Sequence, residues 1–261
     1  MNPLPSSSID VRRIGSVSYL NARPLICGIE DRVRLDVPTL LARDLRAGKL
    51  DAALVPVAEY LEHPRYQIVP GIAIGSRGPV LSVYLASRKP TAEAGTVALD
   101  PASKTSNLLL KVVFAEFLGL SPRYVAGADR ESCDAQLLIG DPALLARERL
   151  LREGYHLLDL GEVWQNKTGL PFVYAFWAVG EGLDGLPYIE FLTRAKERGL
   201  QQLEQIVASE NILPTDVART YLTRHIRYDL GAKEMKGLLE FQRLCVRHGL
   251  IARASELKLA A

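Results

Sequence analysis

The sequence predicts an α/β protein built from two lobes with a cleft between them. Over the first two-thirds of the chain, short apolar runs alternate with segments of helical periodicity, which is typical of a largely parallel sheet covered by helices. Two apolar crossings, at residues 84–88 and 172–179, bracket a central segment, as in a domain inserted into another. We therefore expect residues 1–87 and 176–261 to form one lobe and residues 88–175 to form the inserted lobe.

The first lobe begins with a strand that ends in a polar turn. Its apolar run stops at Ser18, and Pro24 suits the first turn of a following helix. Thr39 is a favourable N-cap for the next helix, and Gly48 ends it. In chain order, this part predicts a strand at 12–17, a helix at 24–29, a strand at 33–37, a helix at 39–47, a strand at 50–55, a helix at 57–61 and strands at 68–74 and 80–87.

The central segment continues the alternation, and the last third of the chain is helical. Asp100-Pro101 and Gly140-Asp141-Pro142 each close an apolar run and precede a helical pattern. The charged C-terminal segments show a helical period without any strand signal, so we expect them to pack outside the first lobe. The predicted strands are 96–99, 135–139, 156–160 and 172–179, and the predicted helices are 106–117, 143–152, 188–209, 216–225 and 232–248.

Composition and charge exclude several classes of protein. The chain of 261 residues is 48% hydrophobic, and 32 basic against 30 acidic residues give a net charge of +2. A dedicated nucleic-acid binder would show a concentrated basic excess, so we expect no nucleic-acid partner. The longest stretch without a charged residue or histidine, 168–180, is shorter than the roughly 20 apolar residues that span a bilayer, so we expect no membrane partner. Residues 1–10 are polar and do not resemble a secretory signal, which favours a cytoplasmic protein.

The cysteines and histidines do not indicate a metal site. Cys27, Cys133 and Cys245 are far apart and form no CxxC pair, so we expect buried thiols rather than disulfides or a zinc site. The histidines show no HExxH or similar spacing. They are His63, His156, His225 and His248.

Polar residues collect at the ends of several predicted strands. In open α/β sheets, ligands bind at the carboxyl ends of strands, often at helix N-termini that attract anions. The segments that fit this description are 16–24, 75–82, 100–107 and 139–143. They hold hydroxyls and small residues, but no paired carboxylates, nucleophile–base pair or phosphate loop.

The first and third of these segments offer the clearest binding groups. Ser18 or Asn21 could simply cap the helix that follows, although the amide of Asn21 can both donate and accept hydrogen bonds. Ser103, Thr105 and Ser106 begin a long helix, and three hydroxyls exceed what one N-cap needs. A carboxylate-binding site at this turn is therefore at least as good an interpretation as capping.

The remaining segments are open to two interpretations each. Asp141 could be an N-cap or part of a cleft wall, and Ser82 could face the gap between the lobes. In the aromatic segment 164–177 the rings fit a hydrophobic core better than a ligand site. Thr168 and Gly169, in the expected turn of that segment, are its better contact candidates.

The motifs resemble those of a known family. Residues 16–25, Ser-Val-Ser-Tyr-Leu-Asn-Ala-Arg-Pro-Leu, resemble the signature of the chorismate dehydratases of the futalosine route to menaquinone. Four further segments resemble family segments in the same order, namely 78–83, 103–106, 138–141 and 168–173. The resemblance implies a type II periplasmic-binding-protein-like fold that has become an enzyme. The implied reaction converts chorismate to 3-[(1-carboxyvinyl)oxy]benzoate with loss of one water.

The resemblance also implies roles for particular residues. The functional asparagine of the family falls on Asn21, which would be catalytic. Ser82, Ser103, Thr105 and Ser106 fall where family members contact substrate carboxylates or line the cleft. Other substrate-binding candidates in the matching motifs are Ser18, Tyr19, Gly140, Asp141 and Thr168.

The matching turns contain no histidine or glutamate that could act as a general base. Our hypothesis is that a carboxylate of chorismate accepts the ring proton, while Asn21 orients that carboxylate or the departing hydroxyl. Asp141 is the fallback base.

We expect no metal or cofactor, and either a monomer or a homodimer. The alternatives are a non-catalytic solute-binding protein, the related dihydroxynaphthoate-forming enzyme of menaquinone synthesis, and a ligand-sensing regulator.

Overall fold

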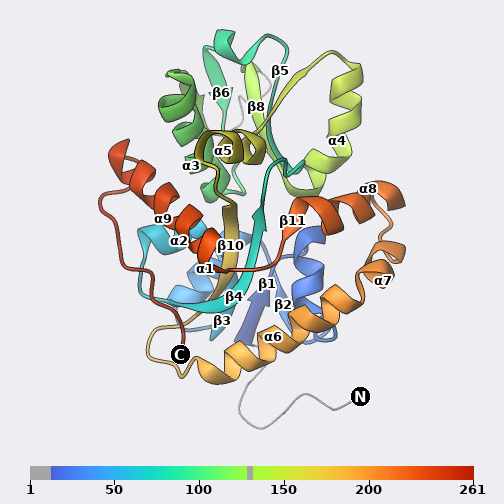
Figure 1. The fold of residues 1–261 in the computed structure, drawn as a ribbon, viewed down its shortest axis with the longest axis vertical. Coiled ribbons are helices and arrows are strands. Elements are labelled where there is room, and N and C mark those ends of the chain that lie inside the picture. The colour runs from blue at the N-terminus through green and yellow to red at the C-terminus, as the bar shows by residue number, and fades with distance from the viewer. Residues whose placement is uncertain (1–12, 128–131) are drawn as a thin grey trace.

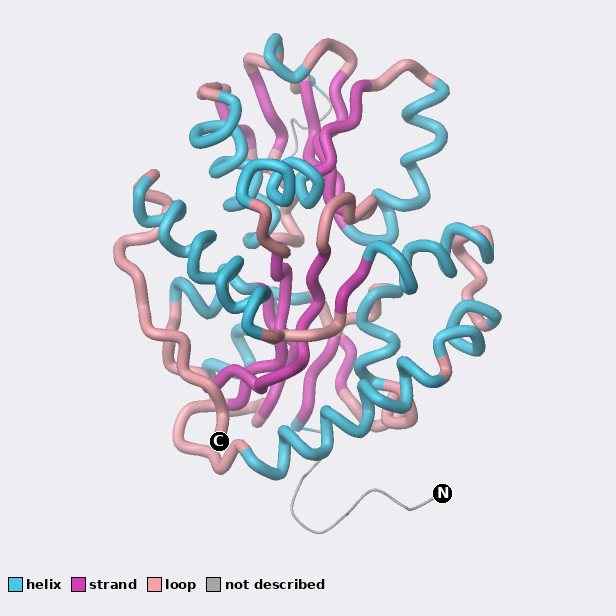
Figure 2. Tube along the Cα trace, in the orientation of Figure 1, coloured by secondary structure: helices cyan, strands magenta, loops and turns pink. Residues whose placement is uncertain are grey.

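Two β-sheets lie one above the other along the long axis of the molecule, each covered by helices (Figures 1 and 2). The computed structural model describes residues 13–127 and 132–261. The expectations for residues 1–10, and the predicted start of the first strand at residue 12, lie outside the described residues. No helix within the described part is long and apolar enough to cross a membrane.

The first sheet has the strand order β11-β4-β10-β3-β1-β2. Its strands β1 and β3 pair in parallel, as do β1 and β2, whereas β10 runs antiparallel to both β3 and β4. Its strands are β1 (Ile14–Ser16), β2 (Arg34–Leu35), β3 (Ala52–Pro56), β4 (Gln67–Ser76), β10 (Phe172–Val179) and β11 (Ile226–Arg227).

The second sheet has the order β7-β6-β8-β5-β9. The strands β7, β6 and β8 are parallel, and β5 runs antiparallel to its neighbours β8 and β9. Its strands are β5 (Val83–Ser87), β6 (Thr96–Ala98), β7 (Arg123–Val125), β8 (Ala135–Ile139) and β9 (His156–Asp159).

Both sheets are mixed, so the prediction of a largely parallel sheet is wrong. Strands joined by helical crossovers are parallel, as such connections require. Besides the pair of β4 with β11, the antiparallel pairs among the described strands involve β5 and β10, the strands that the chain enters from the other sheet. A connection of this kind does not impose the parallel direction. The short strands β7 and β11 were not predicted, because two or three residues carry too little periodicity to detect.

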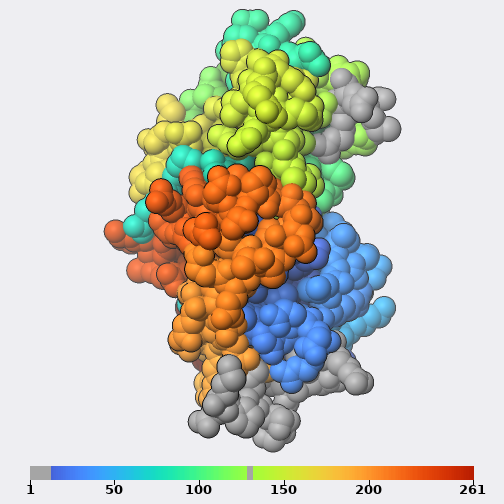
Figure 3. Space-filling view, turned by 90° about the vertical axis from the view of Figure 1, so that its right-hand side faces the viewer, coloured from blue at the N-terminus to red at the C-terminus, as the bar shows by residue number. Residues whose placement is uncertain are grey.

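The chain changes sheet twice, through residues 77–82 and through residues 160–171. Both changes lie a few residues ahead of the expected lobe boundaries, because β5 pairs entirely within the second sheet and β10 entirely within the first. The C-terminal helices return to the first sheet. Those at residues 186–208 lie against residues 20–26 (Figure 3), and the helix at residues 232–247 packs on β10. The division into lobes at those boundaries stays a prediction.

The helices agree with the periodicity in type but differ at several ends. Pro38, not Thr39, begins the second predicted helix, and its N-cap has no side-chain hydrogen bond. The α-helices are α1 (Pro38–Arg46), α2 (Val57–Glu62), α3 (Lys104–Val112), α4 (Gly140–Arg152), α5 (Leu160–Thr168), α6 (Leu186–Gln201), α7 (Leu203–Ala208), α8 (Thr215–Thr220) and α9 (Ala232–Arg247). The other helical turns are the 3₁₀ segments η2 (Leu20–Ile26) and η3 (Thr91–Glu93) and the π segments η4 (Val113–Leu118) and η6 (Tyr221–His225).

Asp159 ties the two changes of sheet together. Its carboxylate accepts hydrogen bonds from the backbone N–H groups of Val80 and Leu81, and it also caps α5 through the N–H of Glu162. Leu81 has φ = 64°, the left-handed conformation that costs a non-glycine residue roughly 1 kcal/mol or more. The bonds to Asp159 hold the segment in this conformation and fix the path that leads to Ser82.

An aromatic cluster joins α5, β10 and α9. The rings of Trp164, Phe172 and Phe241 meet edge to face, with centroids 4.9–5.9 Å apart. All three side chains are fully buried, as are Phe176 and Trp177 of the same segment. The expectation that these rings belong to the core is confirmed. The contacts hold α5, which forms most of the second change of sheet, against the first sheet.

Candidate functional site

A cleft of about 670 Å³ opens between the two sheets, next to the segments where the chain changes sheet. Its lining is largely apolar, with Leu54 and Ile74 from the first sheet, Val17 directly after β1 and Ile139 from the second sheet. None of the described residues that line the cleft is charged. The polar side chains that line it are Tyr19, Asn21, Ser82, Ser103, Ser106 and Tyr174. Such a site suits a small ligand with an apolar body and a few polar groups.

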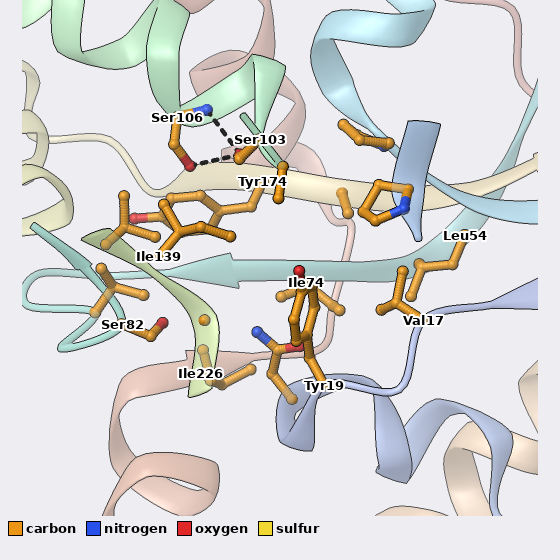
Figure 4. Close-up of a pocket in the computed structure, with 18 residues that line it drawn as sticks. Val17, Tyr19, Leu54, Ile74, Ser82, Ser103, Ser106, Ile139, Tyr174 and Ile226 are labelled. Carbon is orange, nitrogen blue, oxygen red and sulfur yellow. Dashed lines mark hydrogen bonds between the residues drawn. The ribbon is translucent and has the colours of Figure 1, made fainter. Parts of the chain in front are cut away.

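The first turn of α3 brings two hydroxyls to the cleft, on the side opposite Tyr19 (Figure 4). Ser103 is the N-cap, and its Oγ accepts a hydrogen bond from the N–H of Ser106 at 3.2 Å. Ser103 also donates its hydroxyl hydrogen to Ser106 Oγ at 2.8 Å. The first N–H groups of a helix lack intrahelical acceptors and carry partial positive charge. Capping and ligand binding are therefore compatible here, because the capping pair lines the cleft.

The segment η2 places Asn21 on the side of the cleft that is formed by the first sheet. The helical turn begins at Leu20 with Tyr19 as its N-cap, so neither Ser18 nor Asn21 caps it. Pro24 lies inside the turn and not at its start, contrary to the prediction. Apolar side chains of η2 are buried beneath Asn21 and anchor the turn on the core, and they include Leu20, Leu25 and Ile26.

Tyr221 connects two polar groups of the cleft from behind. Its hydroxyl accepts a hydrogen bond from Asn21 Nδ2 at 3.0 Å and donates one to Ser82 Oγ at 2.8 Å. Tyr221 lies in the π turn η6, and its side chain is fully buried. Burial raises the pKa of Tyr221 far above its ordinary value, so the phenol keeps its proton at neutral pH.

Two further tyrosines line the cleft, and the hydroxyl of one of them, Tyr174, lies 3.3 Å from Ser76 Oγ. Burial raises the pKa of Tyr19, and the nearby carboxylates of Asp100 and Asp141 raise it further. Burial also raises the pKa of Tyr174 well above its ordinary value. The ring of Tyr19 lies against Gly140, where an added Cβ would meet the ring carbons at 3.4 Å, and Gly140 has φ = +66°. Both the close approach and the backbone conformation favour glycine at this position.

Six of the predicted site residues therefore come together in the cleft, and four do not line it. Ser18 is exposed. The hydroxyl of Thr105 is buried and accepts a hydrogen bond from Ala58 N at 3.0 Å. Thr168 is not in a loop turn but at the end of α5, where its hydroxyl donates to Trp164 O at 2.8 Å.

Asp141, the fourth of these residues, is directed at the backbone of η2. Its two carboxylate oxygens accept hydrogen bonds from the N–H of Leu20 at 3.1 and 3.2 Å. Asp141 lies in the first turn of α4 and is not its N-cap, which is Ile139. Burial raises the pKa of Asp141. It thus links the second sheet to the first at the edge of the cleft.

Two tyrosines at the site were not among the predicted site residues. Tyr174 lies in the aromatic segment that we assigned to the core, and no alternation marks it, because Tyr174 and its neighbour Ala175 both line the cleft at an irregularity of β10. Tyr221 lies in a helical stretch without any motif, so no local pattern distinguishes it from a core residue. Only the folded chain, which brings residue 221 beside residues 21 and 82, reveals it.

Possible metal ligands come together outside the cleft. Among residues 13–127 and 132–261, one group of side chains could share an ion, namely Glu59, Glu62 and His63. Glu59 already forms an ion pair with Arg46, and Glu62 forms one with Lys104 at 2.5 Å. Since both carboxylates have cationic partners, we assign this group no role in the site.

The two mixed sheets and the cleft between them define the type II periplasmic-binding-protein fold class, which confirms the predicted fold. The structure is similar to the periplasmic aliphatic sulphonate binding protein SsuA from Escherichia coli, with a TM-score of 0.65 and 18% identity over 94% of this chain and 90% of that one. It is also similar to the alkanesulfonate-binding protein SsuA from Xanthomonas axonopodis pv. citri, with a TM-score of 0.64 and 17% identity over 98% of both chains. At these identities the likeness concerns the fold alone.

Within this class, the chain belongs to the menaquinone-biosynthesis family, whose model matches residues 12–247. The family resemblance expected from the motifs is thereby confirmed. A chorismate dehydratase from Thermus thermophilus is 32% identical over 219 residues, which are 76% of this chain and 80% of the relative. A chorismate dehydratase from Campylobacter jejuni is 28% identical over 230 residues, which are 87% of this chain and 90% of the relative.

Proposed function

We propose that this protein is a chorismate dehydratase, which removes water from chorismate to form 3-[(1-carboxyvinyl)oxy]benzoate. The observation that carries the proposal is the cleft itself. It places the amide of Asn21 opposite the hydroxyls of Ser103 and Ser106, within an otherwise apolar lining, in a chain similar to two proteins named chorismate dehydratase. An amide, hydroxyls and helix ends suit a cyclic substrate with two carboxylates.

Neutral donors can bind a dicarboxylate in this cleft. The first turn of α3 offers the hydroxyls of Ser103 and Ser106 together with the positive end of the helix dipole. The start of α4 at Gly140 lies on the second sheet and also lines the cleft. Two helix ends therefore offer one site for each carboxylate, without the cost of burying and pairing a cationic side chain.

The chemistry requires little from the protein besides orientation. A ring proton and a hydroxyl leave as one water, and the ring becomes aromatic, so the step is strongly downhill. In our proposal a substrate carboxylate accepts the ring proton, and Asn21 orients that carboxylate or the departing hydroxyl. Asp141 is poorly placed as the base because both its oxygens face the N–H of Leu20. Holding the reacting groups in position can supply a large part of the rate enhancement.

The direct test is to incubate the purified protein with chorismate and no added cofactor. We expect a product that is lighter by one water and shows aromatic proton signals in the NMR spectrum. Chorismate that binds but stays unchanged would indicate a solute-binding protein and overturn the proposal. Conversion of a cyclic futalosine derivative, with chorismate untouched, would instead indicate the related dihydroxynaphthoate-forming enzyme.

The neighbouring hydroxyls of α3 give the first prediction. We expect Ser106→Ala to raise KM for chorismate by about 10- to 100-fold, because a hydrogen bond to a charged group contributes roughly 1.5–3 kcal/mol. We expect Thr105→Val to leave KM unchanged and to lower the free energy of unfolding by about 1–3 kcal/mol, since the buried N–H of Ala58 loses its acceptor. Steady-state kinetics and urea unfolding of both variants separate the two roles. A KM that rises in Thr105→Val instead would place that hydroxyl on the substrate.

A further inference from the structure

Tyr221 lies directly behind the polar side of the cleft, between two residues of the proposed site. Its ring is fully buried, and its hydroxyl is 3.0 Å from Asn21 Nδ2 and 2.8 Å from Ser82 Oγ. Asn21 comes from η2 and Ser82 from the first change of sheet, while Tyr221 comes from the C-terminal helical segment. One hydroxyl thus joins three segments that are far apart in the sequence.

The number of hydrogens on this hydroxyl decides what its two partners can offer a ligand. A phenol carries one hydrogen. Because Tyr221 donates it to Ser82, it accepts from Asn21, which turns the amide nitrogen of Asn21 toward Tyr221. The amide oxygen of Asn21 and the hydroxyl hydrogen of Ser82 then have no partner within the described part of the protein. The cleft therefore contains an acceptor at Asn21 and a donor at Ser82.

Reversal of the chain of hydrogen bonds would exchange these roles. If Ser82 donated to Tyr221, the phenol would donate to Asn21, and the amide nitrogen would then face the cleft. Tyr221 makes the two residues complementary in either direction, because one presents a donor whenever the other presents an acceptor. Hydrogen bonds in such a chain also polarise one another.

We infer that Tyr221 is a positioning residue, which holds the amide of Asn21 in place and couples its orientation to that of the hydroxyl of Ser82. The inference rests on the proposed function, since it assigns Tyr221 to the dehydration of chorismate. Tyr221 does not line the cleft, so it acts through its partners rather than on the substrate. Its retained proton suits this role, because an ionised phenol could not donate to Ser82.

The test compares two tyrosine variants that each lose one buried hydroxyl. Tyr221→Phe removes both hydrogen bonds, and we expect kcat for chorismate to fall roughly 10- to 100-fold with KM changed by less than about threefold. Tyr228→Phe is the matched control, because Tyr228 is 5% exposed and its hydroxyl has no hydrogen-bond partner among the described residues. We expect this control to keep the wild-type kcat. A Tyr221→Phe variant with wild-type kcat would overturn the inference.

A second measurement reads the orientation of Asn21 without any substrate. The side-chain amide protons of Asn21 are identified in the ¹⁵N NMR spectrum by their absence in Asn21→Ala. We expect one of them to move upfield in Tyr221→Phe, because its hydrogen bond is lost, and to stay in place in Tyr228→Phe. Unchanged amide signals in Tyr221→Phe would overturn the inference. If the wild-type protein left chorismate unchanged, the proposed function would fail, and the amide signals would still decide whether Tyr221 orients Asn21.

Discussion

Replacement of Asn21 by alanine is expected to lower kcat for chorismate by about 10²–10³-fold, the usual cost of removing one well-placed polar group from a reacting centre. The amide of Asn21 lines the cleft, and its nitrogen donates to Tyr221 at 3.0 Å, which leaves the amide oxygen available to a ligand. Alanine removes the group and leaves the buried residues of η2 in place. Steady-state kinetics on chorismate, followed by mass spectrometry of the product, measure the effect.

Two comparison variants make this result specific. Asn166 is exposed on α5, outside the cleft, and we expect Asn166→Ala to keep the wild-type kcat. Asn21→Asp has nearly the same shape but adds a negative charge beside a dicarboxylate. We expect this variant to raise KM as well as lower kcat, because like charges repel strongly in a cleft whose lining, among the residues that the structure describes, contains no cation. An Asn21→Ala enzyme that turns over chorismate at the wild-type rate would exclude the proposed role of Asn21.

Much of the fold follows from local chemistry that can be recognised in the sequence. The strands β8 and β10 have the predicted ends because each is a largely apolar run bounded by turn residues. The helix α5 was missed, although Asp159 and Glu162 have the spacing of a helix start, because Gly161 and a cluster of aromatic residues obscure the pattern. The mixed direction of the strands has no local signal, since it depends on which sheet each strand joins.

Some residues of the site could also be predicted from the local sequence, whereas others depend on contacts between distant segments. Ser103 and Ser106 could be predicted because a helix start beside a strand end has a recognisable sequence. Thr105 has the same surroundings in sequence but points to Ala58, since successive residues of a helix lie about 100° apart and face different neighbours. Tyr221 could not be predicted, because its role exists only where three distant segments meet.

Gly199 is expected to be the most sensitive position outside the cleft. It lies on α6, and an added Cβ would be 1.9 Å from the backbone oxygen of Pro24 in η2. Since that neighbour is backbone, α6 and η2 must move apart to make room. We expect Gly199→Ala to lower the free energy of unfolding by about 1–2 kcal/mol, because an overpacking cost of about 2–3 kcal/mol outweighs the roughly 1 kcal/mol that alanine gains in helix propensity. Urea unfolding measures this change.

The same substitution should also lower turnover, because η2 carries Asn21 only three residues before Pro24. A displaced η2 moves the amide away from Tyr221 and from the substrate, and a misplacement of about 1 Å can cost roughly 10²-fold in rate. Gly95→Ala is the matched control, since its φ suits any residue and its Cβ would meet only Asp134 Oδ2, at 3.6 Å. We expect that control to keep both stability and kcat. Wild-type stability in Gly199→Ala would show that α6 and η2 separate freely, and η2 would then not be the rigid support that positions Asn21.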